Sequence, residues 1–263
     1  MKTLKSLFLI VVLVFLASSC THESLSKLDF KELSASKVES RVNETEPSFD
    51  VDLKIEFPIG GIEDSLLQSI QRTLVTDLLT DKFVGVAPDQ LLNSYLEACY
   101  SDYKILTNDF NDSPVTVNYT EKLNAVPLYV SDKLLTYEAT RYLYQGGAHG
   151  LETTFCWVFD LASGQQITEA DIFVPNYEEP LTQLLIAALN AHAAKIGVPI
   201  TEYWVAQVAP NGNFAITEEG IIYQYNPYDI APYVQGSTRL LLPKQTLLPL
   251  LKEHTSVYEL YAL

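Results

Sequence analysis

The segment Tyr144-Gln145-Gly146-Gly147-Ala148-His149-Gly150 lies near the middle of the chain, and the predicted strands are arranged around it. Three glycines within five residues allow positive φ values that a Cβ would oppose. Runs of β-forming residues, 134–144 and 151–160, enter and leave this stretch. We therefore predict a hairpin whose ordered loop holds His149 in a defined place.

The β character extends outward from this hairpin on both sides. Apolar and polar residues alternate between 115 and 130, between 135 and 143, and again between 155 and 159. Turn-forming residues separate these runs at Ser131-Asp132, at the glycine loop and at Ser163-Gly164. Consecutive strands joined by short turns are typical of an antiparallel meander.

The N-terminal part adds strands and two helices. Residues 49–57 show the clearest two-residue alternation in the chain, which predicts a half-buried strand, and 28–42 show a weaker one. Apolar residues at helical spacing predict helices over 62–79 and from 89 to about 104. The sequence thus predicts an α+β fold in which two N-terminal helices pack on the meander.

The C-terminal part repeats this mixture. Thr168 and Asp171 have the spacing of a capping box, and a long helix is expected from just after Asn176 to about Ile196. A hairpin is expected over 213–225, a strand over 239–242 and a short helix over 245–252. We expect residues 28–165 to form an N-terminal α+β domain that ends in the glycine-loop hairpin, and residues 166–263 to form a C-terminal α+β domain packed against it.

Composition limits the classes of partner. The 263 residues are 48% hydrophobic, which is enough for a sizeable core. The net charge is -16, so the chain repels phosphate backbones, and nucleic acid is not an expected partner. A basic protein partner, cations and plain solubility all remain compatible with this charge.

The first twenty residues predict export. Lys2 and Lys5 precede a short apolar run, 7–16, and then Ala17-Ser18-Ser19-Cys20, which resembles a bacterial lipobox. We expect a lipoprotein signal peptide over 1–20, a lipid on Cys20 and a tether over 21–27. An ordinary signal peptide with an incidental cysteine is the alternative. Cleavage before Cys20 would leave 15 basic and 33 acidic residues, a net charge of -18.

The remaining cysteines and histidines predict no metal or cofactor site. An exported protein can oxidise Cys99 and Cys156, but their apolar neighbours favour buried free thiols. His149 is a candidate base, metal ligand or recognition residue, or a structural hydrogen-bond partner, and no other histidine stands at ligand spacing from it.

A second candidate feature is a loop rich in tyrosine. Tyr223, Tyr225, Tyr228 and Tyr233 are expected to give an aromatic surface that stacks on a sugar ring or a protein partner. Asp229 and the pair Glu218-Glu219 add carboxylates, which hydrolyse glycosides only at a set spatial separation.

These segments together resemble a known family. The stretch 144–150, then Phe159-Asp160-Leu161, Asp171-Ile172-Phe173, 220–225 and 228–233 are similar to the RsiV-like and PdaC-like extracytoplasmic domains, of the domain-of-unknown-function 3298 type. The similarity extends over about 28–252. It implies an α+β fold and work at the cell envelope, since members include a lysozyme-sensing ectodomain and the non-catalytic region of a peptidoglycan deacetylase. Neither a sigma-binding segment nor a deacetylase domain is expected here.

These observations favour a lipid-anchored envelope protein that binds a basic lysozyme-like protein or a peptidoglycan fragment without catalysis. The membrane is expected to be contacted through the N-terminal lipid only. The alternative is a cell-wall glycan hydrolase that uses His149 or Asp229, and a purely structural role is a third possibility. The expected binding residues are Gly146, Gly147, His149, Tyr223, Tyr225, Tyr228, Asp229 and Tyr233.

Overall fold

The computed structural model describes residues 28–39, 48–109 and 118–262. The expected signal peptide, the tether and Cys20 lie outside these residues, as do Val115 and Val117 of the expected meander. Among the described residues, no helix combines the length and the apolar character needed to cross a membrane.

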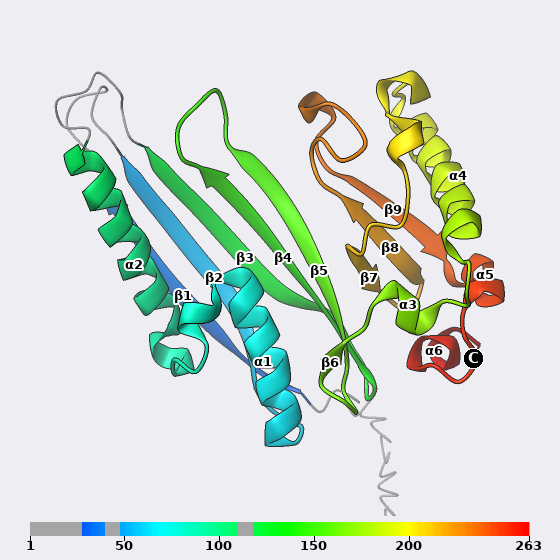
Figure 1. The fold of residues 1–263 in the computed structure, drawn as a ribbon, viewed down its shortest axis with the longest axis horizontal. Coiled ribbons are helices and arrows are strands. Elements are labelled where there is room, and N and C mark those ends of the chain that lie inside the picture. The colour runs from blue at the N-terminus through cyan, green and yellow to red at the C-terminus, as the bar shows by residue number, and fades with distance from the viewer. Residues whose placement is uncertain (1–27, 40–47, 110–117, 263) are drawn as a thin grey trace, which may run out of the picture.

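The described residues form two β-sheets flanked by helices, which confirms the expected α+β class (Figure 1). The larger sheet has the strand order β1-β2-β3-β4-β5-β6 and carries two helices on one face. Its elements are β1 (Asp29–Glu39), β2 (Phe49–Gly60), α1 (Asp64–Leu78), α2 (Pro88–Asp109), β3 (Tyr119–Val130), β4 (Leu134–Tyr144), β5 (Leu151–Asp160) and β6 (Gln165–Gln166). The weak first strand, the strongly alternating second strand and both N-terminal helices are confirmed.

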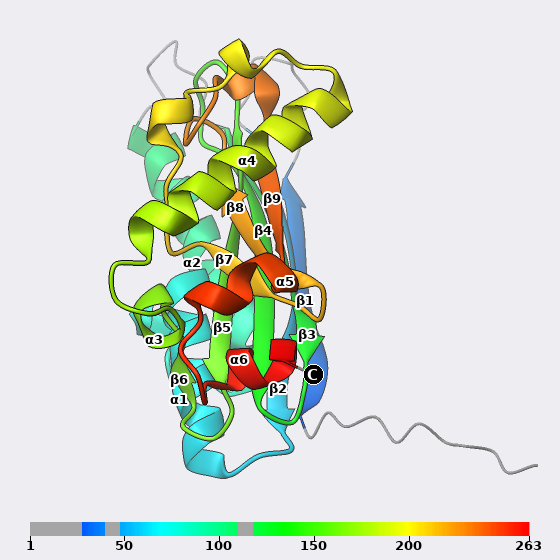
Figure 2. The same cartoon turned by 90° about the vertical axis from the view of Figure 1, so that its right-hand side faces the viewer.

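The smaller sheet has the order β7-β8-β9 and belongs to the C-terminal half. It lies against β4 and β5, and α4 lies across its outer face (Figure 2). The elements of this half are α3 (Glu169–Ile172), α4 (Glu178–Ile196), β7 (Phe214–Ile216), β8 (Gly220–Tyr225), β9 (Thr238–Pro243), α5 (Lys244–Leu247) and α6 (Ser256–Ala262). The capping box of Thr168 and Asp171 is present, and the expected 218–220 turn joins β7 to β8.

The expected meander is confirmed, since β3, β4 and β5 pair antiparallel in chain order, but two other features of the fold were not expected. Strands β2 and β3 pair in parallel, with Phe49 opposite Tyr119, because α1 and α2 carry the chain back to the end of the sheet where β2 began. The C-terminal helix α6 was not expected, although Ser256 and Glu259 have the spacing of a helix start, and the Thr255 hydroxyl accepts the Tyr258 N–H at 3.1 Å.

The stacking of the sheets explains why the first residues of β4 are buried on both faces. Leu134, Leu135, Thr136 and Tyr137 are all buried, because helices cover one face of this strand and the smaller sheet covers the other. The odd-numbered residues belong to the core under α1 and α2, whereas Leu134 belongs to the core of the C-terminal half. The two halves therefore share β4 and β5 as a common wall.

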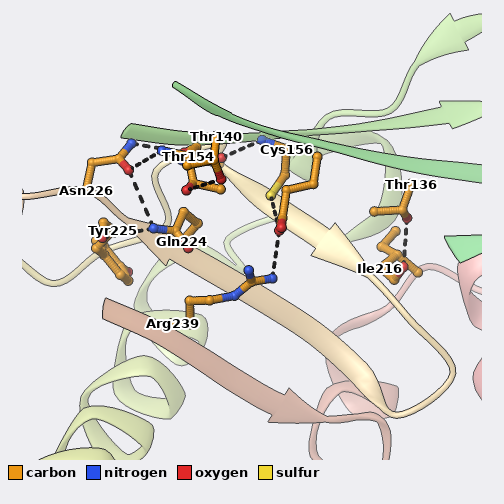
Figure 3. Close-up of polar contacts among 11 residues, drawn as sticks. Thr136, Thr140, Thr154, Cys156, Ile216, Gln224, Tyr225, Asn226 and Arg239 are labelled. Carbon is orange, nitrogen blue, oxygen red and sulfur yellow. Dashed lines mark hydrogen bonds and ion pairs between the residues drawn. The ribbon is translucent and has the colours of Figure 1, made fainter. Parts of the chain in front are cut away.

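Polar contacts hold the two sheets together (Figure 3). The Thr136 hydroxyl donates to the Ile216 carbonyl oxygen at 2.7 Å, and Arg239 of β9 pairs with Glu138 of β4 at 2.8 Å. These contacts join residues that are 80 and 101 positions apart in the chain. They fix the smaller sheet at a definite place on β4, and so they also fix the loops that the smaller sheet carries.

A buried carboxylate anchors α2 to the larger sheet. Glu121 of β3 is fully buried and accepts hydrogen bonds from the hydroxyls of Tyr95 at 3.0 Å and Tyr119 at 2.7 Å. Arg141 of β4 completes the cluster with its Nε 3.1 Å from the same carboxylate. Burial and the adjacent Glu121 charge raise the pKa of both tyrosines, so the phenols stay protonated as donors.

Candidate functional site

The glycine loop joins β4 to β5, as the sequence predicts. Gly146 and Gly147 have φ values of +96° and +98°, which residues with a side chain rarely adopt. The Tyr144 hydroxyl donates to the Gly147 carbonyl oxygen at 3.0 Å. At Gly150 the reason for glycine is space, since an added Cβ would lie 2.3 Å from the Tyr142 ring. The loop is therefore ordered by both backbone conformation and close packing.

His149 lies at the end of this loop with its imidazole exposed. Its Nδ1 is 2.9 Å from the Gly150 carbonyl oxygen, and its ring stacks on Tyr233 with the ring centroids 3.9 Å apart and the planes at 22°. The Tyr233 hydroxyl donates to the same Gly150 oxygen at 3.0 Å. His149 is thus held by stacking and hydrogen bonding together, on the surface of the molecule.

Tyr228 completes a group of three rings, in which His149 and Tyr228 are exposed and Tyr233 is half-buried. It has a φ of +75°, is 51% exposed, and its ring centroid lies 5.7 Å from that of Tyr233. Its hydroxyl is 3.5 Å from Nε2 of His149. A positive φ at an aromatic residue is unfavourable and persists only where the surroundings fix it. We call His149, Tyr228 and Tyr233 the aromatic shelf.

Asp229 shapes the loop that carries the shelf. Its Oδ2 accepts the Asn226 N–H at 2.7 Å, and its own N–H donates to the Asn226 carbonyl oxygen at 3.0 Å. These two bonds close a tight turn, a usual role for aspartate. The carboxylate remains exposed, and its Oδ1 has no partner in the described part of the chain.

Two asparagine side chains dock this region on the free edge of β5. Asn226 accepts the Thr154 N–H at 2.7 Å and donates to the Thr154 carbonyl oxygen at 3.0 Å (Figure 3). Asn213 does the same one step along, accepting the Cys156 N–H at 2.9 Å and donating to the Thr154 oxygen at 2.8 Å. Each amide replaces a neighbouring strand, because it offers one donor and one acceptor to the edge.

The structure corrects two of the expected site residues. Tyr223 and Tyr225 of β8 are buried, and the Tyr225 hydroxyl donates to the Ala209 carbonyl oxygen at 2.7 Å. Burial raises the pKa of both phenols. Neither ring is part of an exposed aromatic surface, because β8 lies in the middle of a sheet that is covered on both faces. Of the expected aromatic residues, His149, Tyr228 and Tyr233 do converge.

The expected carboxylates do not converge. Glu218 and Glu219 lie in the turn before β8, whereas Asp229 lies in the loop after it. The six residues of β8 separate them by about 20 Å. The two carboxyls of a glycosidase stand about 5 to 10 Å apart. These residues therefore cannot form such a pair with each other.

A groove that the sequence did not predict lies next to the loops that carry the aromatic shelf. It has a volume of about 580 Å³ and lies between β5, the segment 207–213 and the loop 225–230. Leu151 and Phe155 of β5 expose 38% and 46% of their surface there. Tyr225 contributes to its lining, and Asp229 is the one charged side chain of the lining. Leu151, Thr153 and Phe155 share one face of β5 with the core residues Trp157 and Phe159, so the sequence pattern does not separate the groove from the core.

Other reactive groups lie apart from this region or within the interior. Cys99 of α2 and Cys156 of β5 are free thiols. Burial raises the pKa of Cys156 to about 12, with a further contribution from Glu138. Within the described ranges, no three His, Cys, Asp or Glu side chains are grouped to hold a metal ion.

Comparisons with known proteins show a sequence match in the C-terminal half and a likeness of fold over most of the chain. The model of a family described as "Protein of unknown function (DUF3298)" matches residues 170–245. No curated protein matches this sequence. The chain's fold is similar to that of a DUF3298-family protein from Bacteroides fragilis, with a TM-score of 0.78 and 22% identity, covering 91% of this chain and 99% of that one. A DUF3298-family protein from Pseudomonas aeruginosa gives a TM-score of 0.58 and 20% identity, covering 86% and 95%.

The sequence match is narrower than the resemblance inferred from the motifs. It includes Tyr228, Asp229 and Tyr233 but not the glycine loop with His149. The likeness of fold, in contrast, extends over most of the chain. The expected resemblance to the domain-of-unknown-function 3298 type is thus confirmed: residues 170–245 match the DUF3298 family model, and the chain has the fold of solved DUF3298-family proteins.

Proposed function

We propose that this protein is a lipid-anchored protein of the bacterial cell envelope that binds a ligand through the aromatic shelf without catalysing a reaction. The observation that carries the proposal is the convergence of His149, Tyr228 and Tyr233 from two distant segments into one ordered group at the surface. Exposed aromatic rings on a rigid support are typical of recognition surfaces, because little conformational entropy is lost when they bind.

A basic, lysozyme-like protein is the ligand that we favour. The chain carries a net charge of -16, and Asp229 next to the shelf has an unpaired carboxylate oxygen. Opposite charge on a partner would accelerate association and would make the binding dependent on salt. A peptidoglycan fragment is the second candidate, because the half-exposed ring of Tyr228 is free to stack on a sugar.

The glycan hydrolase that uses His149 or Asp229 has less support. The Asp229 carboxylate already accepts a backbone hydrogen bond that closes its turn, and the glutamate pair lies at the other end of β8. His149 stacks on Tyr233 and contacts the Tyr228 hydroxyl, and these contacts fix the orientation of its imidazole ring. A general base instead needs a nucleophile or a water within hydrogen-bonding distance of its free nitrogen.

The test is a binding measurement on the domain that begins after residue 20. Hen egg-white lysozyme and, separately, purified peptidoglycan are offered at about 20 mM and about 300 mM salt, over which screening of surface charges increases strongly. We expect lysozyme to bind at low salt and to be weakened at least about tenfold by Tyr228→Asn, since a central aromatic side chain contributes much of an interface's energy. Asparagine tolerates the positive φ of this position, so the substitution removes the ring and retains the backbone.

Leu128→Asn is the matched control, because Leu128 is an exposed apolar residue of β3 outside the shelf. Lysozyme and peptidoglycan both failing to bind at low salt would overturn the proposal. Binding that Tyr228→Asn and Leu128→Asn weaken equally would overturn the assignment of the site. New soluble products from peptidoglycan that disappear with His149→Ala would favour the hydrolase instead.

A further inference from the structure

The groove beside the aromatic shelf suggests how a partner of the proposed kind is held. Its lining is mostly apolar and includes Leu151, Phe155, Pro210, Tyr225 and Ile230. Its volume of about 580 Å³ lies within the range of specific small-ligand pockets and exceeds what one side chain fills. Nothing in the described part of the chain fills it, so two large apolar side chains on β5 remain partly exposed.

The walls of the groove are fixed in place. One wall is β5, a strand paired along its whole length with β4. The opposite wall begins at Asn213 and Asn226, whose amides bond the backbone of Thr154 and Cys156. A groove with walls tied together in this way is present before a ligand arrives, which reduces the free-energy cost of binding.

The three asparagine side chains of the groove are engaged already. Asn213 and Asn226 bond β5, and the Asn211 amide donates to the Gln224 carbonyl oxygen at 2.9 Å. Asp229 differs from them, because its Oδ1 has no partner among the described residues while Oδ2 closes the turn. The lining contains no lysine or arginine, so this carboxylate determines the sign of the charge that the groove accepts.

We propose that this groove binds a segment of a basic polypeptide, which places an apolar side chain against Leu151 and Phe155 and an adjacent lysine or arginine against Asp229. The inference rests on the proposed function in one respect, that the natural partner is a basic protein. An apolar floor selects a large aliphatic or aromatic residue. The single carboxylate and the excess of acidic residues in the chain favour a cation beside it and disfavour an acidic peptide.

The aromatic shelf and the groove adjoin each other along two short stretches of chain. Tyr228 and Asp229 are consecutive residues, and the first belongs to the shelf whereas the second lines the groove. Likewise, His149 precedes by two residues Leu151, which lines the groove. A partner seated on the shelf can therefore extend one chain segment into the groove without either loop having to move.

The first arm of the test uses hen egg-white lysozyme with variants of the groove. We expect Phe155→Ser to weaken binding about tenfold through lost apolar contact. Asp229→Asn, which retains an oxygen for the Asn226 N–H, should weaken binding about two- to fivefold and reduce its salt dependence. Leu128→Ser is the control for Phe155→Ser, because Leu128 is exposed to 39% and Phe155 to 46%, but Leu128 does not line the groove.

The second arm does not depend on lysozyme. The peptide acetyl-Gly-Leu-Lys-Gly-amide and its counterpart with glutamate in place of lysine are titrated into the isotopically labelled domain, and backbone amide signals are followed by NMR. We expect the lysine peptide to shift the signals of Thr153, Phe155 and Asp229 while that of Leu128 stays in place. The glutamate peptide should leave all four unchanged, because it meets an unpaired carboxylate.

The outcomes separate the two proposals. Lysozyme binding that Tyr228→Asn weakens but Phe155→Ser and Asp229→Asn leave unchanged would overturn the groove and leave the proposed function standing. If lysozyme does not bind but the lysine peptide shifts the groove signals, the groove stands and the basic-protein function falls. Equal shifts from both peptides would overturn the role of Asp229, and shifts from neither would overturn the groove as a peptide site.

Discussion

Replacing Asn226 with alanine tests whether side-chain amides hold the shelf-bearing loop on β5. Asn226 makes two hydrogen bonds to Thr154, at 2.7 Å to its N–H and at 3.0 Å to its carbonyl oxygen. A hydrogen bond contributes about 0.5–1.5 kcal/mol to stability, and a buried group left without a partner costs about 1–3 kcal/mol. Thr154 is buried, but Asn213 still bonds its carbonyl oxygen, so only its N–H loses every partner.

The expected loss is therefore about 2–3 kcal/mol in the free energy of unfolding. Urea unfolding followed by tryptophan fluorescence suits this measurement, because Trp157 lies in the core under α1 and α2. Trp204 lies near the loop, and its backbone N–H donates to the Ile230 carbonyl oxygen. The control is Asn190→Ala on α4, since Asn190 is exposed and bonds only its own helix. A loss below about 0.5 kcal/mol in Asn226→Ala, as expected for an ordinary surface change, would refute the reasoning.

Three further predictions concern the scaffold. Gly220→Ala should lower the free energy of unfolding in urea by about 3 kcal/mol, because the new Cβ would lie 2.1 Å from the Leu242 carbonyl oxygen. In the control Gly60→Ala, the nearest atom to the new Cβ is 3.4 Å away, so the loss should be less than about 1 kcal/mol. Glu121→Ala should cost about 3–5 kcal/mol by leaving Arg141 without its buried partner, and a loss similar to that of an exposed glutamate such as Glu97→Ala would contradict the anchoring role. Cys156, with its pKa raised to about 12, should resist iodoacetamide at pH 8 in the folded protein and react after denaturation, as mass spectrometry of its peptide can show; rapid labelling of the folded protein would contradict its burial.

Local patterns in the sequence predicted the elements well. The alternation of Phe49, Val51, Leu53, Ile55 and Phe57 placed β2, because each of these side chains faces the core under α1 and α2. Thr168 and Asp171 marked a helix start whose two capping bonds are present. In each case the deciding interaction lies within a few residues, so a short stretch of sequence contains it.

Pairings between distant residues could not be predicted in the same way. Periodicity shows that β2 and β3 are strands, but their parallel pairing depends on how far α1 and α2 carry the chain. The tyrosines of β8 were expected at the surface because the sequence does not show that α4 and the larger sheet cover both faces of this strand. In the sequence, nothing distinguishes Asn213 and Asn226 from ordinary loop asparagines, because their hydrogen-bond partners on β5 are distant in the chain.

The three rings of the aromatic shelf come from two distant segments of the chain, so the smallest fragment that could carry the whole shelf must contain both segments. Residues 170–245, which match the family model, supply Tyr228 and Tyr233, and they also supply both docking asparagines. Their partners, His149 and the backbone of Thr154 and Cys156, lie in the larger sheet outside that match. The matched segment alone would lack one ring of the shelf, the β5 wall of the groove and the edge that fixes its loop. Because the Tyr228 backbone is held in an unfavourable conformation, it needs that support from β5 to persist. The proposed recognition at this site would therefore require both sheets, even though the family match is confined to the half that contains the smaller one.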